Sequence, residues 1–408
     1  MEGLYGAKNI KLYKVLPLGG FRRDMKQKIR MGMVGGGKKA FIGAVHRMAA
    51  SLDGLIELSC GAFSSNAENA IESGKDLFLP DNRIYTSYAE MITAESKLPA
   101  SERIHFVSIV TPNNLHFEPA MLALENGFHV LIDKPITLTL AEAKALKAKA
   151  DETGLMICLT HTYSGYPMVK QAKKMVKDGA FGKIRKVVVE YPQGWLSLPA
   201  DADNKQAAWR ADPAKSGISG CMADVGTHAA HLAEYISGLQ ITKICADLNI
   251  VVENRLLDDD GNVLLKFDNG ANGVLFASQI AAGEENAIKI YVYGEKGGLE
   301  WHQMEPNTLL VKWLDQPMQV YRTGNGYNSD IAKYNTRTPS GHPEGYLEAF
   351  ANIYKNFAQT IAAKENGTTP SEEMLDFPGA AEGVRGMAFI ENVVASSKSE
   401  QKWYDFTV

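Results

Sequence analysis

Three side chains that could move a proton or stabilise a negative charge stand in two short segments of the sequence. Lys134 follows the apolar run Val130–Ile132 and precedes a proline. Asp224 and His228 are four residues apart, so that on a helix both lie on one face. An imidazole titrates near neutrality and can accept a proton, and an ammonium group can stabilise an oxygen that gains negative charge. The three side chains could therefore serve acid–base chemistry if the fold brings them together.

Each of these side chains also has a structural interpretation. Lys134 could be an exposed residue at a strand end, His228 a hydrogen-bonded buried imidazole, and Asp224 the cap of the helix that follows it. Together with His231, Asp224 and His228 could also ligate a metal ion. No further cluster of potential ligands in the sequence supports such a site, and we expect no metal.

A glycine-rich loop is the second feature. Gly35, Gly36 and Gly37 follow the strand candidate Ile29–Val34 and open a helical stretch. The loop fits the pattern G-x-G-x-x-A, in which glycines allow a tight turn and a close approach to a pyrophosphate, and a small third residue lets helix and strand pack closely. The helix N-terminus then donates N–H groups to the phosphates; the alternative is a glycine-rich turn without a ligand. The residues expected to contact a dinucleotide here are Gly35, Gly36, Gly37, Ala40, Phe41 and Ile42.

The end of the second strand candidate bears on the choice of coenzyme. Leu55–Phe63 is followed by Ser64, Ser65 and Asn66, where a dinucleotide-binding fold usually has an acid that grips the adenine ribose. The two serines leave room for a 2′-phosphate, but no arginine stands beside them to pair with it. We expect Ser64 and Ser65 to contact NAD or NADP, with NAD slightly favoured.

Two further segments follow strand candidates of the same sheet. Thr111–His116 comes after Phe106–Val110, and Asp133–Pro135 comes after Val130–Ile132. Ligands of open α/β sheets bind outside the carboxyl ends of the strands. The residues of these segments that we expect at the coenzyme are Thr111, Pro112, Asn113, His116, Asp133 and Lys134.

The order of the elements predicts two domains. Short apolar runs alternate with helical stretches from Ile29 to about Cys158, which predicts an α/β Rossmann nucleotide-binding domain with a doubly wound parallel sheet. From Lys243 to Tyr321 strands follow one another without helices, with hairpin signals at Asp258–Asn262 and Asp268–Gly270. This part predicts an α+β domain with a large, mostly antiparallel open sheet. The predicted divisions are an N-terminal arm (1–27), the Rossmann domain (28–158) and a substrate-binding and oligomerisation domain (159–408).

Composition excludes several classes of protein. The 408 residues carry a net charge of −4, which provides no electrostatic footprint for nucleic acid or an anionic membrane. No apolar stretch is long enough to span a bilayer. Arg22-Arg23 could open an export signal, but no apolar region follows it before the first strand. Four scattered cysteines indicate neither a zinc site nor a disulfide framework. We therefore expect a cytoplasmic protein that binds neither nucleic acid nor membrane.

The motifs, taken in order, resemble those of the glucose–fructose oxidoreductase/inositol dehydrogenase (Gfo/Idh/MocA) superfamily. The resemblance covers residues 29 to about 235: the glycine loop, Thr111–His116, the helix-ending Gly127–Val130, and Asp224–His228, which matches the family's D-x-G-x-H motif. The family's E-K-P motif appears as Asp133–Pro135. Two residues depart from the pattern: Asp133 replaces the usual Glu, and His231 stands where many members have Asp, which leaves the substrate contacts open.

The resemblance implies an NAD(P)-dependent dehydrogenase that moves hydride between nicotinamide and a secondary hydroxyl of a sugar, glycoside or inositol-like cyclic polyol. By motif, His228 is the general acid/base, Lys134 hydrogen-bonds the reacting oxygen, and Asp224 orients His228 or binds an adjacent hydroxyl. Aromatic and amide side chains after the first strand of the second domain suit a polyol pocket, although core packing is an equal interpretation of Trp195 and Trp209. The expected substrate-binding residues are Lys134, Tyr163, Gln193, Trp195, Arg210, Asp224, His228 and, unless it only caps a helix, His342.

Two other functions remain open at this stage. One is an NAD-dependent glycosidase of the same superfamily, which oxidises C3 transiently and eliminates the glycosidic group. The other is a nucleotide-binding sensor or regulator without catalysis, against which the presence of Lys134, Asp224 and His228 argues. Because family members commonly pair through the sheet of the second domain, the resemblance also implies a homodimer or homotetramer.

Overall fold

The first half of the chain forms a parallel sheet. The computed structural model describes residues 27–38, 40–199 and 212–408; the expected N-terminal arm lies almost entirely outside them. The strands of the first sheet are β1 (Ile29–Gly35), β2 (Ile56–Ala62), β3 (Phe106–Val110), β4 (His129–Ile132) and β5 (Ile157–Leu159). Their order is β2-β1-β3-β4-β5, and all pairs are parallel. This arrangement confirms the Rossmann-type fold predicted from the alternation of strands and helices.

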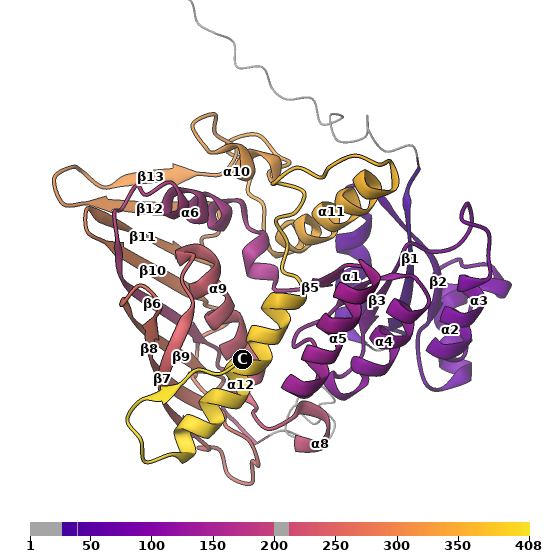
Figure 1. Cartoon of the computed structure of the whole chain (residues 1–408), viewed down its shortest axis with the longest axis horizontal. Helices are drawn as coiled ribbons and strands as arrows, with labels where there is room; N and C mark the ends of the chain where they lie inside the picture. The colour runs from indigo at the N-terminus through magenta and orange to yellow at the C-terminus, as the bar shows by residue number, and fades with distance from the viewer. Residues whose placement is uncertain (1–26, 39, 200–211) are drawn as a thin grey trace, which may run out of the picture.

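Helices cover both faces of this sheet. On one face, α3 (Tyr88–Ser96), α4 (Phe117–Glu125) and α5 (Leu140–Thr153) bury apolar side chains against the strands, and α2 (Ala67–Asp76) follows β2. On the other face, α1 (Phe41–Ser51) is joined by α11 (Tyr346–Glu365), which comes from the far end of the chain (Figure 1). Phe350, Tyr354 and Phe357 of α11 pack against β1 and β3. The C-terminal part of the chain thus completes the nucleotide-binding layer.

The second sheet has nine strands. They are β6 (Ile184–Pro192), β7 (Ile241–Asn249), β8 (Asp260–Phe267), β9 (Asn272–Ser278), β10 (Lys289–Gly294), β11 (Gly297–His302), β12 (Thr308–Trp313), β13 (Gln319–Arg322) and β14 (Tyr404–Asp405). Their order is β13-β12-β11-β10-β6-β9-β8-β7-β14, and every pair except β6–β9 is antiparallel. The predicted large, mostly antiparallel sheet is confirmed.

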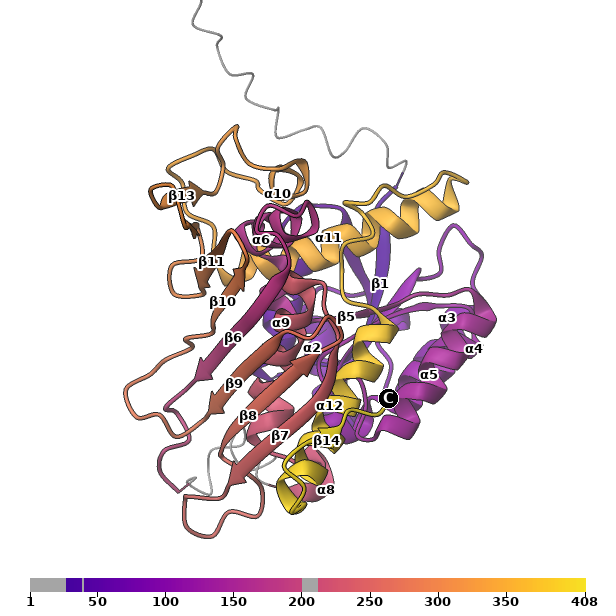
Figure 2. The same ribbon diagram turned by 60° about the vertical axis from the view of Figure 1, so that its left-hand side comes forward.

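One face of the second sheet is covered by helices and the other is open. α6 (Pro167–Lys177), α9 (Thr227–Ser237) and α12 (Ala380–Lys398) lie between this sheet and the Rossmann domain, as Figure 2 shows. Side chains alternate along the strands, so that Val263 and Leu265 of β8 are buried while Leu264 between them is exposed. The shorter helices are α8 (Pro213–Ser216) and α10 (Asp330–Tyr334). Among the described residues no helix is long and apolar enough to cross a membrane.

One of the two hairpin signals is displaced from its turn: β7 and β8 do pair antiparallel, but residues 250–259 connect them. Asp268–Gly270 does form the turn between β8 and β9, with Gly270 at a φ of 87°. Asp258–Asn262 does not form a turn, because its last three residues already belong to β8. The carboxylate of Asp258 instead accepts backbone N–H groups of Gly220 and Met222, both at 2.9 Å. Acidic residues before a glycine favour a turn locally, but here a distant segment uses the first of them as its anchor.

Candidate active site

Lys134 and Asp224 meet where the two domains face each other. Lys134 follows β4, and its Nζ donates to Oδ1 and to the backbone oxygen of Asp224, both at 2.6 Å. Gln279, just after β9, donates from Nε2 to the other carboxylate oxygen of Asp224 at 2.9 Å. Asp224 therefore orients the ammonium group of Lys134. Lys134 and Asp224 were both predicted as site residues from the sequence, whereas Gln279 was not.

A π-helical turn presents Asp224 to the lysine. The turn spans Met222–Gly226 and leads directly into α9. Such turns are rare and occur mostly at functional sites. Its start is held by Asp258, whose carboxylate also accepts a hydrogen bond from Ser219 Oγ at 3.1 Å. The side chain of Asp224 does not cap α9, because the residue before the helix is Gly226 and no side-chain cap is present.

His228 lies in the first turn of α9 and is buried, with 7% of its surface exposed. Its Nδ1 is 3.4 Å from Nδ1 of His161, and the ring of Tyr163 meets it edge-on with centroids 4.9 Å apart. Burial, followed by the nearby Lys134 cation, holds the pKa of His228 well below its usual value, against an opposing effect of Asp224. The imidazole is therefore neutral near pH 7 and can accept a proton.

Asp133, the residue before Lys134, makes hydrogen bonds that position the lysine. Its Oδ1 accepts hydrogen bonds from Thr160 Oγ1 at 2.8 Å and from the backbone N–H of Lys134 at 2.9 Å. Its Oδ2 lies 3.9 Å from Nε2 of His46, whose Nδ1 is 2.7 Å from the hydroxyl of Tyr354. Burial alone would raise the pKa of Asp133, but His46, Lys134 and Thr160 together lower it. Asp133 is thus ionised, and its carboxylate fixes the backbone at Lys134.

The glycine loop has the shape that a dinucleotide requires. Gly35 and Gly36 have φ angles of 84° and 73°, which side chains rarely adopt. A Cβ on Gly43, in the first turn of α1, would lie 2.3 Å from the Cα of Gly36. The close approach of helix and loop therefore falls on Gly43, which the pattern did not single out, whereas Ala40 precedes the helix. No described side chain caps the start of α1, so the first N–H groups at Phe41 and Ile42 are available to a phosphate.

The end of β2 faces this loop. Ser64 Oγ accepts hydrogen bonds from the backbone of Asn66 at 3.1 Å and from Nδ2 of Asn69 at 3.2 Å, and Ser65 is exposed beside it. Lys38, in the loop, pairs with two carboxylates of α2, at Glu72 and Asp76. The residues fit an adenosine end with two ribose hydroxyls.

Thr111 and His116 link the loops after β3 and β4. His116 is buried, with Nε2 at 2.8 Å from the oxygen of Thr111 and Nδ1 at 2.9 Å from the oxygen of Pro135. Pro112 lies between them in the chain, and Nδ2 of Asn113 donates to the oxygen of Ser216 at 3.4 Å. These contacts hold the strand ends, and hence Lys134, in place.

The expected substrate-binding side chains form a connected polar group. The hydroxyls of Tyr163 and Tyr191 contact each other, and Tyr191 donates to Oδ1 of Asn286 at 2.6 Å. Nε2 of Gln193 donates to the same oxygen at 2.7 Å, and Nε1 of Trp195 donates to Gln193 at 2.9 Å. Trp195 is 44% exposed, so it is not a core residue. The ring of Tyr163 joins this group to His228.

One expected residue has no contact with this group among the described residues, and another lies outside them. His342 is exposed, and its Nδ1 lies 3.3 Å from the oxygen of Pro339 in its own turn. Arg210, like Trp209, lies outside the described residues. Sequence reasoning missed Gly43, His46, His161, Gln279 and Asn286; only Gly43 and His46 carried a local signal, as a glycine and a histidine three residues apart at the helix start.

Comparison with known proteins agrees with this geometry. Residues 29–161 match the oxidoreductase family with an NAD-binding Rossmann fold, and residues 169–300 match the GFO/IDH/MocA C-terminal domain. The chain belongs to the Gfo/Idh/MocA family. It is therefore an NAD(P)-dependent dehydrogenase of the two-domain type, which confirms the predicted fold class, enzyme class and coenzyme type.

Similar proteins cover nearly the whole chain. "Uncharacterized oxidoreductase YfiI" of Bacillus subtilis is 34% identical over 94% of this chain and 98% of its own. An inositol dehydrogenase homolog of Azotobacter vinelandii, solved with NADH and myo-inositol, is 33% identical with a TM-score of 0.86, over 94% of this chain and 99% of its own. Levoglucosan dehydrogenase of Pseudarthrobacter phenanthrenivorans is 25% identical over 93% and 98%.

Proposed function

We propose that this Gfo/Idh/MocA protein oxidises a secondary hydroxyl of a cyclic polyol or sugar with NAD as the hydride acceptor. The observation that carries the proposal is the convergence of three groups. The ammonium group of Lys134, fixed by Asp224, lies at the end of β4 together with the neutral imidazole of His228. Relatives of similar length act on levoglucosan or are solved with myo-inositol, which supports this substrate class.

The residues divide the reaction between them. The coenzyme, when bound across the glycine loop, accepts the hydride at its nicotinamide ring. His228 takes the proton of the substrate hydroxyl, and its low pKa keeps it in the accepting form. Lys134 donates a hydrogen bond to the same oxygen and stabilises the negative charge that develops there. Asp224 and Asp133 hold the lysine in position.

Polar side chains of the second domain bind the substrate hydroxyls that do not react. Gln193, Tyr191 and Asn286 present amide and phenol groups beside His228, and the partly exposed Trp195 offers an aromatic face. Sugar and inositol rings have polar edges and apolar faces that match this combination. Arg210 remains a predicted contributor, whereas His342 contacts only its own turn among the described residues.

NAD is favoured over NADP. The only described lysine in the coenzyme loop, Lys38, is paired with Glu72 and Asp76 on α2. A 2′-phosphate near Ser64 would approach these carboxylates, and like charges at such distances oppose binding. We expect a kcat/KM at least about tenfold higher with NAD, a ratio that the double substitution Glu72→Gln and Asp76→Asn lowers.

The experiment that tests the proposed function measures NADH and NADPH formation over a panel of inositols, aldoses and glycosides. The matched variants are Lys134→Met and His228→Ala, and we expect both to lose turnover on the substrate found. Intact turnover in both would refute the assigned roles. Release of free sugar without net NADH would instead identify the glycosidase, and tight coenzyme binding without turnover of any compound would identify a sensor.

The open face of the second sheet is the expected contact between subunits. Leu264, Tyr293 and Val320 are exposed on strands of this face, and stacked Tyr291 lies beside Tyr293. Exposed apolar side chains on a broad sheet favour association of a second copy. We expect a homodimer or homotetramer in light scattering, shifted towards monomer by Leu264→Lys with Val320→Lys. We also expect a cytoplasmic location, where the unpaired cysteines of this chain stay reduced.

A further inference from the structure

His161 is a buried histidine beside the active site that the proposed mechanism does not use. It follows β5 and precedes the short helical turn Thr162–Gly165. Its side chain is 2% exposed, and its backbone oxygen accepts a hydrogen bond from Ser164 Oγ at 2.8 Å, which fixes the turn. Nδ1 of His161 lies 3.4 Å from Nδ1 of His228, with the two rings nearly perpendicular at 84°.

This contact constrains the proton positions on both rings. Two imidazole nitrogens can share a hydrogen bond only if one carries a proton and the other a lone pair. Because a neutral imidazole has one N–H, the direction of this hydrogen bond decides which nitrogen of His228 is left with a lone pair. Within the described part of the chain, Nε2 of His228 has no hydrogen-bond partner, so this is the nitrogen open to a substrate.

His161 is held as a neutral ring. The imidazole of His231 stacks on it with centroids 4.2 Å apart and an angle of 7°, and Tyr235 stacks on the far side of His231. Burial, followed by the neighbouring His231 and His228, keeps the pKa of His161 well below its usual value. A neutral ring can serve as an acceptor through one nitrogen, whereas a protonated ring can only donate.

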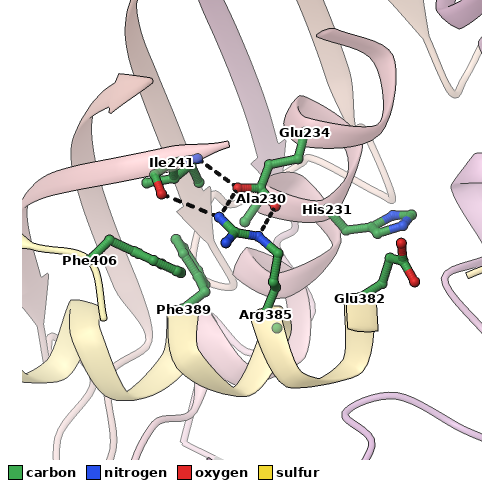
Figure 3. A pocket seen from close by; sticks show the side chains of 9 residues that line it. Ala230, His231, Glu234, Ile241, Glu382, Arg385, Phe389 and Phe406 are labelled. Carbon is green, nitrogen blue, oxygen red and sulfur yellow. Dashed lines mark hydrogen bonds and ion pairs between the residues drawn. The ribbon is translucent and has the colours of Figure 1, made fainter. Parts of the chain in front are cut away.

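His231, one ring of this stack, also lines a separate cavity beside α9 and α12, which Figure 3 shows. His231 and Glu382 lie there side by side, and Nε2 of His231 is buried without a hydrogen-bond partner in the described residues. Arg385 and Glu234, which also line the cavity, form an ion pair. The cavity thus borders the histidine stack at His231.

We propose that His161 is a positioning residue: it accepts a hydrogen bond from Nδ1–H of His228 and thereby leaves the lone pair of His228 on Nε2, facing the substrate. This inference rests on the proposed role of His228 as the base. When His228 takes the substrate proton at Nε2, its Nδ1–H remains hydrogen-bonded to His161. Because His228 is then a cation, this hydrogen bond becomes charge-assisted. The 3.4 Å contact is long, as is common for catalytic hydrogen bonds before substrate binds.

Other groups around His228 do not supply this acceptor. Lys134 and His231 disfavour its protonated form, and Asp224 and Asp133 favour it through their charges. Tyr163 and Tyr191 contribute ring contacts, at 4.9 Å and 6.2 Å between centroids. The only hydrogen bond of the His228 side chain among described residues is the one to His161.

Two substitutions separate the acceptor from the shape of the side chain. His161→Leu removes the acceptor, and we expect kcat/KM for oxidation to fall about 100-fold with the affinity for NAD unchanged. His161→Asn places a carbonyl oxygen near the position of Nδ1, and we expect recovery to within about fivefold of the parent. In His161→Leu the acid limb of the kcat/KM profile also moves to lower pH, because the protonated His228 loses its acceptor; in His161→Asn it returns.

A matched control is a buried histidine outside the site. Nδ1 of His105 accepts the backbone N–H of Arg30 at 2.8 Å, where β1 and β3 begin in the Rossmann sheet. His105→Leu removes an acceptor of the same kind, and we expect lower thermal stability with an unchanged pH profile. Equal loss and equal pH dependence in His161→Leu and His161→Asn would assign His161 a packing role and overturn the proposal.

A spectroscopic readout keeps this test independent of any substrate. Nitrogen-15 NMR of histidine-labelled full-length protein distinguishes the two neutral tautomers, and the signals of His228 are those that His228→Gln removes. We expect the Nδ1–H tautomer in the parent and in His161→Asn, and a mixture in His161→Leu. An Nε2–H tautomer in the parent overturns the role of His161, whereas a correct tautomer without turnover of any polyol refutes only the proposed function.

Discussion

Two lysine–aspartate pairs in this protein share their local geometry and differ in their surroundings. Nζ of Lys134 donates to a carboxylate oxygen and to the backbone oxygen of Asp224, both at 2.6 Å. Nζ of Lys170 does the same to Asp376, at 2.5 Å and 3.0 Å. The side chains of the first pair are 14% and 18% exposed, and those of the second 1% and 5%.

The partners of each carboxylate explain the difference. Asp376 also accepts hydrogen bonds from Tyr235 at 2.7 Å and from Lys173 at 2.5 Å, so its oxygens are saturated by protein groups within the second domain. Asp224 stands at the ends of the parallel strands beside His228, with Lys134 still partly open to solvent. A buried ion pair is thus no sign of an active site by itself; access for a substrate and a neighbouring proton acceptor make the distinction.

The largest expected effect is the loss of catalysis when the accessible pair is broken. Lys134→Met removes the cation that we propose stabilises the reacting oxygen, and we expect kcat/KM to fall about 10³-fold. The melting temperature should change little, because the site stays partly solvated. Steady-state kinetics and calorimetry measure the two quantities. A large loss of stability with retained turnover would mean that the two pairs have the same role.

Breaking the enclosed pair should have the opposite outcome. Lys170→Met leaves the Asp376 carboxylate with one cation fewer in the core, and we expect the free energy of unfolding to drop by about 3 kcal/mol. Urea unfolding measures this change. Titration with coenzyme gives the concentration of folded protein, to which turnover is normalised. Turnover per folded molecule should stay within about twofold of the parent, and a selective loss of turnover would contradict the comparison.

The pH dependence sharpens the comparison further. Lys170 and Lys173 lower the pKa of Asp376 against the effect of its burial, so this pair stabilises the fold above about pH 4 and the contribution is lost as the pH falls below it. In the proposed mechanism His228 is the base, and its lowered pKa places the acid limb of kcat/KM below about pH 6.5. An acid limb at or above pH 6.5, measured at saturating coenzyme, would argue against His228 as the base.

The smallest expected effect concerns an exposed pair of the same residue types. Lys147 and Asp151 on α5 lie 2.6 Å apart with 41% and 65% of their side chains exposed. Because water and salt screen such a pair, Lys147→Met should change the free energy of unfolding by at most about 0.5 kcal/mol and leave kcat/KM unaltered. A change in the free energy of unfolding above about 1 kcal/mol would show that exposure does not determine how much these ion pairs contribute to stability.

Much of the candidate site could be predicted because its parts are local patterns. Alternation of strands and helices predicted the parallel sheet, and glycines 35 to 37 marked a loop in which Gly35 and Gly36 have left-handed φ angles. Lys134, Asp224 and His228 stand in short motifs. The end of a parallel strand places Lys134 at one edge of the sheet, and the π-helical turn and α9 bring Asp224 and His228 to it. Gly43 escaped notice because its packing against Gly36 appears only when the helix is built onto the strand.

The residues that only the tertiary structure revealed act across long distances in the chain. His161 meets His228 from 67 positions away, and Asp258 anchors the turn of Asp224 from a segment with the composition of a hairpin. Helix α11 covers the sheet of the first domain although it follows the second in the chain. Local propensity and motif spacing are properties of the sequence and determined the elements and their chemistry. Which side chains pair between elements depends on packing, because burial selects partners by position rather than by order in the chain.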